Sequence, residues 1–128
     1  DWIVALEWGR SVGGLPALIA RAEANAGAVR AFCAARDWIA ELAEDPAAAS
    51  TTSVCLRFTD PAIRDDAGFA KAVARRLEAE GVGLDLGAYR DAPPGLRIWC
   101  GATVETANVE ALLPWIEWAY RSERAAHG

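Results

Sequence analysis

The sequence has no methionine, one histidine and one lysine, so several kinds of catalytic site are poorly supplied. His127 is the second-last residue, where chain ends are usually mobile, and neither a histidine-activated nucleophile nor a histidine metal site is expected there. Lys71 lies two residues from both Phe69 and Val73, so helical spacing turns it away from their apolar face. We expect a solvated lysine there and no Schiff base.

Cysteine is scarce, and its spacing excludes two further classes. Cys33, Cys55 and Cys100 are far apart and odd in number, which fits neither a disulfide framework nor a zinc site. We therefore expect a reducing, cytoplasmic compartment. Cys33 lies on an apolar helical face and the other two lie inside predicted strands, so all three are predicted to be small buried hydrophobes.

Long apolar runs and blocks of positive charge are also missing. No stretch reaches the roughly 18–20 apolar residues that a bilayer span needs. The net charge is −5 and the 13 basic residues are scattered, so a nucleic-acid partner is not expected. A hydrophobic content of 53% indicates a globular domain. Because the chain lacks methionine and starts as if inside a helix, we expect it to be a piece of a longer protein.

Four segments have helical periodicity. They are residues 1–12, residues 16–36 after the Gly13-Gly14 break with Pro16 as the first helical residue, a segment around 69–80 ended by Gly81, and a segment from 106 to about 120. Pro114 predicts a kink or a fresh helix start. Trp2, Trp8, Trp115 and Trp118 have helical spacing and are interpreted as packing residues, with a missing neighbour as one possible contact.

Polar residues on these helices receive simple structural interpretations. Arg21, Asn25 and Arg30 fall mainly outside the apolar stripe of their helix and are predicted to be solvated. Thr106 is a candidate cap for the last helix. Asp65 and Asp66 precede a helix and are better charge partners for its N-terminus than an acid–base pair.

Four segments are candidate strands: residues 38–43, 52–59, 82–86 and 96–102. The predicted order is α-α-β-β-α-β-β-α, with a hairpin among the strands. This pattern indicates an α+β fold, with a small, mostly antiparallel sheet covered by helices on one face.

Two arginines flank a Pro-Pro-Gly turn just before the last predicted strand. Arg97 alternates with the apolar Leu96 and Ile98 and projects to the opposite face, while Arg90 precedes the turn. A guanidinium fork suits a carboxylate or a phosphate. The residues alone leave two alternatives for each arginine: a ligand anion, or an internal partner or solvent.

Three segments resemble the C-terminal region of phosphoserine aminotransferases: "TTSVCLRFTDP" (51–61), "GAYRDAPPGLRIWCGATVE" (87–105) and "ALLPWIEWAY" (111–120). The segment "WGRSVGGLPALIARAEAN" (8–25) is similar to the end of that family's interdomain helix. The resemblance implies that residues 1–14 are the end of that helix with a linker, and that residues 15–128 are a C-terminal small domain.

The same resemblance implies an activity. The family consists of cytoplasmic, homodimeric, pyridoxal-phosphate enzymes of fold type I, which transfer an amino group between phosphoserine and 2-oxoglutarate in serine biosynthesis. In the family's Gly-x-Arg motif the arginine binds the substrate carboxylate, a role that falls on Arg97 through Gly95-Leu96-Arg97. A His-Arg pair helps to bind the phosphate. Its nearest match is Tyr89-Arg90, one residue further from the Gly-x-Arg motif, so only Arg90 inherits that role.

The resemblance also implies what the chain lacks. A cofactor lysine in its expected setting is absent, so pyridoxal phosphate would be bound by a large domain outside this sequence, and the chain alone would be inactive. The alternatives are the small domain of another class V aminotransferase of the alanine–glyoxylate type, or a free-standing anion-binding α+β module. A cysteine desulfurase would need a cysteine on a mobile loop, and no cysteine here is placed that way.

Overall fold

The computed structural model describes residues 1–127, with side chains as far as residue 126. In chain order the elements are α1 (Trp2–Ser11), α2 (Gly14–Ala34), β1 (Ile39–Glu41), the short 3-10 helix η1 (Pro46–Ala48), β2 (Ser53–Phe58), α3 (Asp66–Ala79), β3 (Leu96–Trp99) and α4 (Thr106–His127). His127, predicted to lie in a mobile tail, is the last residue of α4, and its side chain lies outside the described part.

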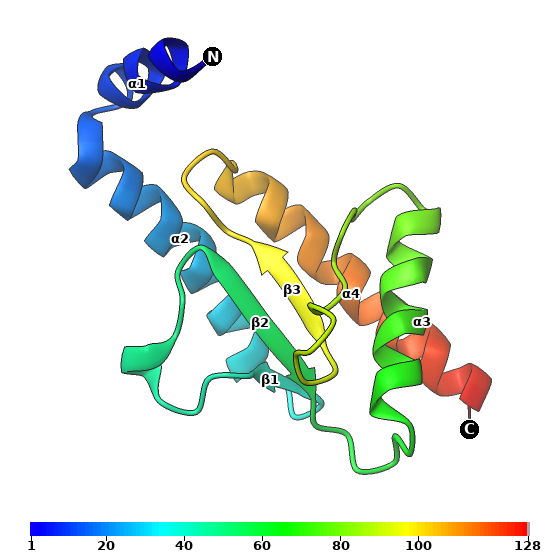
Figure 1. Ribbon diagram of the computed structural model, residues 1–128. Helices are drawn as coiled ribbons and strands as arrows, with labels where there is room; N and C mark the ends of the chain where they lie inside the picture. Colours follow the sequence, from blue (N-terminus) through cyan, green and yellow to red (C-terminus); the bar gives the residue numbers. More distant parts are fainter. Residues whose placement is uncertain (128) are drawn as a thin grey trace.

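The three strands form one antiparallel sheet in the order β1-β2-β3 (Figure 1). The register pairs Ile39 with Phe58 and Val54 with Ile98. Side chains of these paired positions face the same side, where α2, α3 and α4 pack against the sheet. The predicted α+β class, with helices covering one face of a small antiparallel sheet, is confirmed.

The core lies between the sheet and the three helices, and aliphatic side chains from every layer meet there. Its largest fully buried aliphatic members are Val29, Ile39, Val54, Leu56, Val73, Leu77, Leu96 and Ile116. An aromatic group closes one end, where the rings of Trp38 and Tyr120 stack with centroids 3.9 Å apart. Cys33 and Cys100 are buried as predicted, whereas Cys55 is only partly buried.

Several predicted helix ends are confirmed. The Asp65 side chain caps α3 by accepting a hydrogen bond from the Gly68 amide at 2.9 Å. After α3, Gly81 adopts a left-handed φ of 70°, which lets Val82 donate back to the Leu77 carbonyl at 3.1 Å. Lys71 is exposed on α3, also as predicted.

The predicted strand at residues 82–86 is wrong. The segment pairs with β3 at only one point. There the backbone amide of Arg97 donates to the Leu86 carbonyl at 2.8 Å, and Gly87 forms an isolated bridge with Leu96. Left-handed backbone at Gly81 and at Asp85, whose φ is 53°, turns the chain too sharply for a continuous ladder. Apolar content alone predicted a strand where the backbone forms turns.

Two prolines lie inside helices, and neither one starts a helix. Helix α2 begins at Gly14, two residues before Pro16, so the proline lies inside the first turn, where backbone amides lack helical partners anyway. Helix α4 runs through Pro114 without a fresh start. Pro114 and Glu110, whose carbonyl loses a helical donor, are both exposed, so water can satisfy that carbonyl.

Asn25 contradicts the prediction that it is solvated, because it is fully buried. Its side-chain amide donates to the carbonyls of Cys100 and Val104 at 3.1 and 2.9 Å, and its carbonyl oxygen accepts from the Thr106 hydroxyl at 2.6 Å. Thr106 is the first residue of α4, so the cap position falls to the residue before it. The backbone carbonyl of Glu105 starts that helix, accepting from Asn108 at 2.9 Å.

Helix α1 extends away from the rest of the chain (Figure 1). It meets α2 at an 83° bend, where Gly13 has a φ of 114°. Its apolar side chains are exposed, with Trp2 at 75% and Ile3 at 61%. Within residues 1–127 no single helix is both long and apolar enough to cross a membrane, although the bent pair α1 and α2 together meets that test by length and composition.

Candidate functional site

The face of the sheet turned away from the helices carries the candidate site. Cys55 pairs with Arg97 and Ser53 pairs with Trp99 across β2 and β3, so these four side chains share that face. None of the four belongs to the buried core, and Trp99 is 54% exposed. Sequence alternation predicted this placement of Arg97, opposite Leu96 and Ile98, and the structure confirms it.

Arg97 is held from three sides. Its Nη2 atom donates to Asp85 Oδ2 at 2.7 Å and lies 3.4 Å from the Asp85 carbonyl oxygen. Its Nη1 donates to the Tyr89 hydroxyl at 3.4 Å, and the guanidinium carbon lies 4.3 Å from the centre of the Tyr89 ring. The loop between α3 and β3 therefore surrounds Arg97, which is the first residue of β3 with its side chain on the open face.

The guanidinium is nevertheless incompletely satisfied. Among the described residues, Arg97 Nε is buried and has no hydrogen-bond partner. The side chain is 14% exposed, so one edge of the fork remains near the surface. The hydrogen bond with Asp85 raises the pKa of Arg97 above its ordinary value, and the guanidinium stays charged. The unpaired Nε–H is buried, so only the part of the charged fork near the surface is open to an anion.

Asp85 is an unusual partner for this arginine. Its side chain is 85% exposed, and its φ of 53° lies in the left-handed region, which costs a non-glycine residue about 1–2 kcal/mol. Such an exposed ion pair contributes little, typically about 0–1 kcal/mol. Arg97 thus has an internal anionic partner, which is one of the two alternatives that the residues alone left open. The ion pair between Asp85 and Arg97 is nevertheless weak.

Arg90 is placed differently from Arg97. It is exposed and lines a hollow of about 710 Å³ between α3 and the 85–95 segment, together with Asp85, Tyr89 and Lys71. Arg97 does not line this hollow. The two arginines therefore border the same loop from different sides, with Asp85 and Tyr89 between them, and no hydrogen bond within residues 1–127 joins them to each other.

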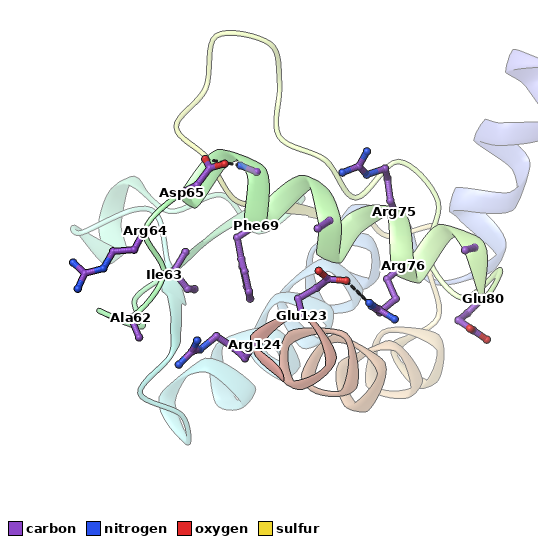
Figure 2. A pocket seen from close by; sticks show the side chains of 13 residues that line it. Ala62, Ile63, Arg64, Asp65, Phe69, Arg75, Arg76, Glu80, Glu123 and Arg124 are labelled. Atoms are coloured by element: carbon purple, nitrogen blue, oxygen red, sulfur yellow. Dashed lines mark hydrogen bonds and ion pairs between the residues drawn. The ribbon is translucent and has the colours of Figure 1, made fainter. Parts of the chain in front are cut away.

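A second hollow, of about 810 Å³, lies between α3, the end of α4 and the 62–65 loop (Figure 2). It has several arginines but is a poor anion site. Arg76 is paired with Glu123, and Arg124 is paired with Asp60. Figure 2 shows Arg64 and Arg75 at separate places along the groove, Arg64 on the 62–65 loop and Arg75 on α3. The positive charges of this groove do not converge on one point.

Asp85 and Tyr89 were not predicted as parts of the site. Both lie in a loop, and their contacts with Arg97 depend on how that loop folds, which no periodicity encodes. A weak signal is visible in hindsight: an aspartate placed between two leucines, in a glycine-rich stretch, shortly before the Gly-x-Arg motif. Aspartate is one of the few residues that accept left-handed backbone.

Comparison with known proteins gives one consistent result. No protein-family model matches the chain. The phosphoserine aminotransferase of Methanosarcina barkeri (strain Fusaro / DSM 804) is 48% identical over 120 residues, which are 94% of this chain and 31% of the relative. That of Methanosarcina mazei is 47% identical over the same shares. The chain spans about a third of the length of the curated relatives it matches.

Solved structures agree on the fold. A structure titled "Phosphoserine aminotransferase from Bacillus circulans subsp. alkalophilus" has a TM-score of 0.74 at 22% identity. Another, of radiation damage to the Schiff base in a phosphoserine aminotransferase, has a TM-score of 0.74 at 14% identity. Each match covers 91% of this chain and 30% of the other. The chain is therefore similar, in sequence and in fold, to one part of the phosphoserine aminotransferases, the family that its motifs resemble.

Proposed function

We propose that the chain is the C-terminal small domain of a phosphoserine aminotransferase, with residues 1–14 as the end of the interdomain helix and its linker and residues 15–128 as the domain. The complete enzyme would transfer an amino group between phosphoserine and 2-oxoglutarate in serine biosynthesis. The identity of 48% over 94% of the chain supports the assignment most directly. The sharp bend at Gly13 between α1 and α2 supports the boundary.

In this proposal Arg97 binds the α-carboxylate of the substrate. The supporting observation is its charged guanidinium beside the open sheet face, whose Nη2 holds only a solvated aspartate and whose buried Nε–H has no partner. A carboxylate that replaces this aspartate would accept from Nη2, and also from Nε where the cover over Nε opens. Fixing the carboxylate this way would orient the bond that reacts, which is how positioning residues accelerate a reaction.

Arg90 is proposed to contact the substrate phosphate. Support comes from its exposure, and from its position on the loop whose Asp85 and Tyr89 also contact Arg97. An exposed guanidinium on the loop that surrounds Arg97 would suit the second anionic group of a substrate that carries both a carboxylate and a phosphate. Tyr89 inherits no role from the family's histidine; its ring stacks on the Arg97 guanidinium.

The residues of this chain do not fit pyridoxal phosphate. A Schiff-base lysine must be sheltered, yet the single lysine of the sequence, Lys71, is exposed on α3. We therefore place the cofactor on residues outside these 128, and propose that the chain alone is inactive. A homodimer in a cytoplasmic compartment fits the family and the three free cysteines.

The test is transamination by the full-length protein, with phosphoserine and 2-oxoglutarate. Arg97→Ala should raise KM by about tenfold to a hundredfold, because charge-assisted hydrogen bonds contribute about 1.5–3 kcal/mol. Arg64→Ala, an exposed arginine that points into solvent, is the matched control and should leave KM unchanged. An unchanged KM in Arg97→Ala would remove the assignment.

Arg90→Ala separates the proposal from its alternatives. Loss of activity with phosphoserine, but not with alanine, would identify a phosphate contact. Equal activity with both donors would favour an aminotransferase of the alanine–glyoxylate type. Absence of transamination in the full-length protein, with anion binding retained, would favour a free-standing anion-binding module.

A further inference from the structure

Asp85 presents a carboxylate to the same atoms of Arg97 that the proposed substrate would use. Its Oδ2 accepts from Nη2 at 2.7 Å, while the neighbouring Nε stays without a partner. We propose that Asp85 is an internal stand-in for the substrate carboxylate, which occupies the Arg97 fork in the empty site and is displaced when a carboxylate ligand binds. This inference rests on the proposed role of Arg97.

Breaking the hydrogen bond between Asp85 and Arg97 costs little free energy. Asp85 is 85% exposed, so its carboxylate returns to water with little loss of hydration. Its side chain holds Arg97 through one carboxylate oxygen, the Asp85 carbonyl adds only a longer contact of 3.4 Å, and Nε has no partner. Its left-handed φ of 53° shows that the backbone is bent to present this side chain.

A ligand carboxylate gains more from the same arginine than Asp85 does. It takes the Nη2 donor that Asp85 leaves, and a side-on approach would also give an acceptor to the unpaired Nε–H, which is buried while Asp85 is in place. The Tyr89 ring remains stacked on the guanidinium, since that contact involves the face of the group and not its donor edge. The exchange leaves one carboxylate on Arg97 before and after, so the site never exposes an uncompensated charge.

The geometry limits the movement to the Asp85 side chain. Directly after it, Leu86 is buried, and its carbonyl accepts from the Arg97 amide at 2.8 Å. Gly87 then bridges to Leu96. Because the backbone is fixed to β3 on this side, Asp85 can leave the fork by side-chain rotation without opening the loop. Asp85 is therefore a positioning residue that sets the affinity for carboxylates.

The experiment measures binding of glutarate, an unreactive dicarboxylate, to the full-length protein by isothermal titration calorimetry at fixed pH and ionic strength. Asp85→Asn keeps a residue that accepts left-handed backbone but removes the competing charge. It should bind glutarate roughly two- to fivefold more tightly than the natural protein, the range that an exposed ion pair allows. Asp85→Gly, which relieves the backbone restriction, should do the same and replaces Asp85→Asn if that variant folds poorly.

Asp91→Asn is the matched control, because it removes an exposed aspartate from the same loop and should bind like the natural protein. Glutarate binding by Asp85→Asn that is equal to the control, or weaker, would overturn the proposal. If Asp85 had a purely structural role, Asp85→Asn would bind glutarate more weakly. Tighter binding of glutarate therefore distinguishes competition by Asp85 from a structural role. Arg97→Ala separates the two claims: if it binds glutarate normally, the proposed role of Arg97 fails, whatever the Asp85 variants do.

Discussion

The Thr106 hydroxyl donates to the side-chain oxygen of Asn25 at 2.6 Å, joining the start of α4 to the middle of α2. The Asn25 amide nitrogen also donates to the carbonyls of Cys100 and Val104, in the turn that follows β3. Arg21, one helical turn earlier, donates to the Ala102 carbonyl at 2.7 Å. Helix α2 thus fixes the end of the strand that carries Arg97.

Replacing Asn25 should destabilise the fold strongly. Asn25→Ala leaves three backbone carbonyls and a hydroxyl without their buried partner, and we expect a loss of about 2–3 kcal/mol in the free energy of unfolding. Urea denaturation of the 128-residue chain measures it. Asn108→Ala, an exposed asparagine on α4, is the control and should change stability by under about 0.5 kcal/mol. Equal losses in the two variants would contradict this role.

Two glycines should respond in opposite ways to alanine. A Cβ at Gly95 would lie 1.8 Å from the Leu56 carbonyl oxygen, so β2 and β3 could not keep their spacing. Gly95→Ala should therefore lower the melting temperature markedly and disturb Arg97, two residues on. Gly27, inside α2, has nothing within 4 Å of that position, so Gly27→Ala should stabilise the chain by about 0.5–1 kcal/mol.

Differential scanning calorimetry of the two glycine variants measures both changes, a lower melting temperature for Gly95→Ala and a higher one for Gly27→Ala. A melting temperature of Gly95→Ala that matches the natural chain would show that the strands can separate at this point without cost. A lower melting temperature for Gly27→Ala would mean that α2 needs flexibility there, which its uninterrupted hydrogen bonding does not indicate.

Stability should depend on Asp60 below neutral pH. The Tyr120 hydroxyl donates to its carboxylate, and with the Ala62 amide and Arg124 it lowers the pKa of Asp60. A lowered pKa in the folded state adds stability above the unfolded pKa of about 3.9, and this part is lost as pH falls through the folded value. Asp60→Asn should be less stable at pH 7 and should lose less on acidification than the natural chain.

The measurement is the free energy of unfolding of the natural chain and of Asp60→Asn from pH 7 down to pH 3, at constant ionic strength. Asp91→Asn, with its side chain in solvent, should follow the natural chain throughout. Parallel curves for Asp60→Asn and the natural chain would contradict a linkage through this carboxylate.

The sequence predicted the regular parts of the fold because their signals are local. Alternation in residues 96–102 placed Arg97 on the open face, and helical spacing placed Val73 and Leu77 in the core. Asn25 was misjudged because its partners lie 75 or more residues away, and a polar residue off an apolar stripe is usually solvated. The contacts of Asp85 and Tyr89 with Arg97 were missed for a different reason: they span only 12 and 8 residues, but the conformation of a loop decides them.

One thiol should be far more reactive than the other two. Burial raises the pKa of Cys33 and of Cys100 to about 11, so at pH 8 only about one thiol in a thousand is ionised at either position. Cys55 is partly exposed on the open sheet face beside Arg97. Titration of the folded chain with Ellman's reagent at pH 8 should show one fast equivalent, and two slow ones that accelerate on unfolding. Cys55→Ser should remove the fast phase alone; a fast phase that persists would place the reactive thiol in the core and contradict the burial of Cys33 and Cys100.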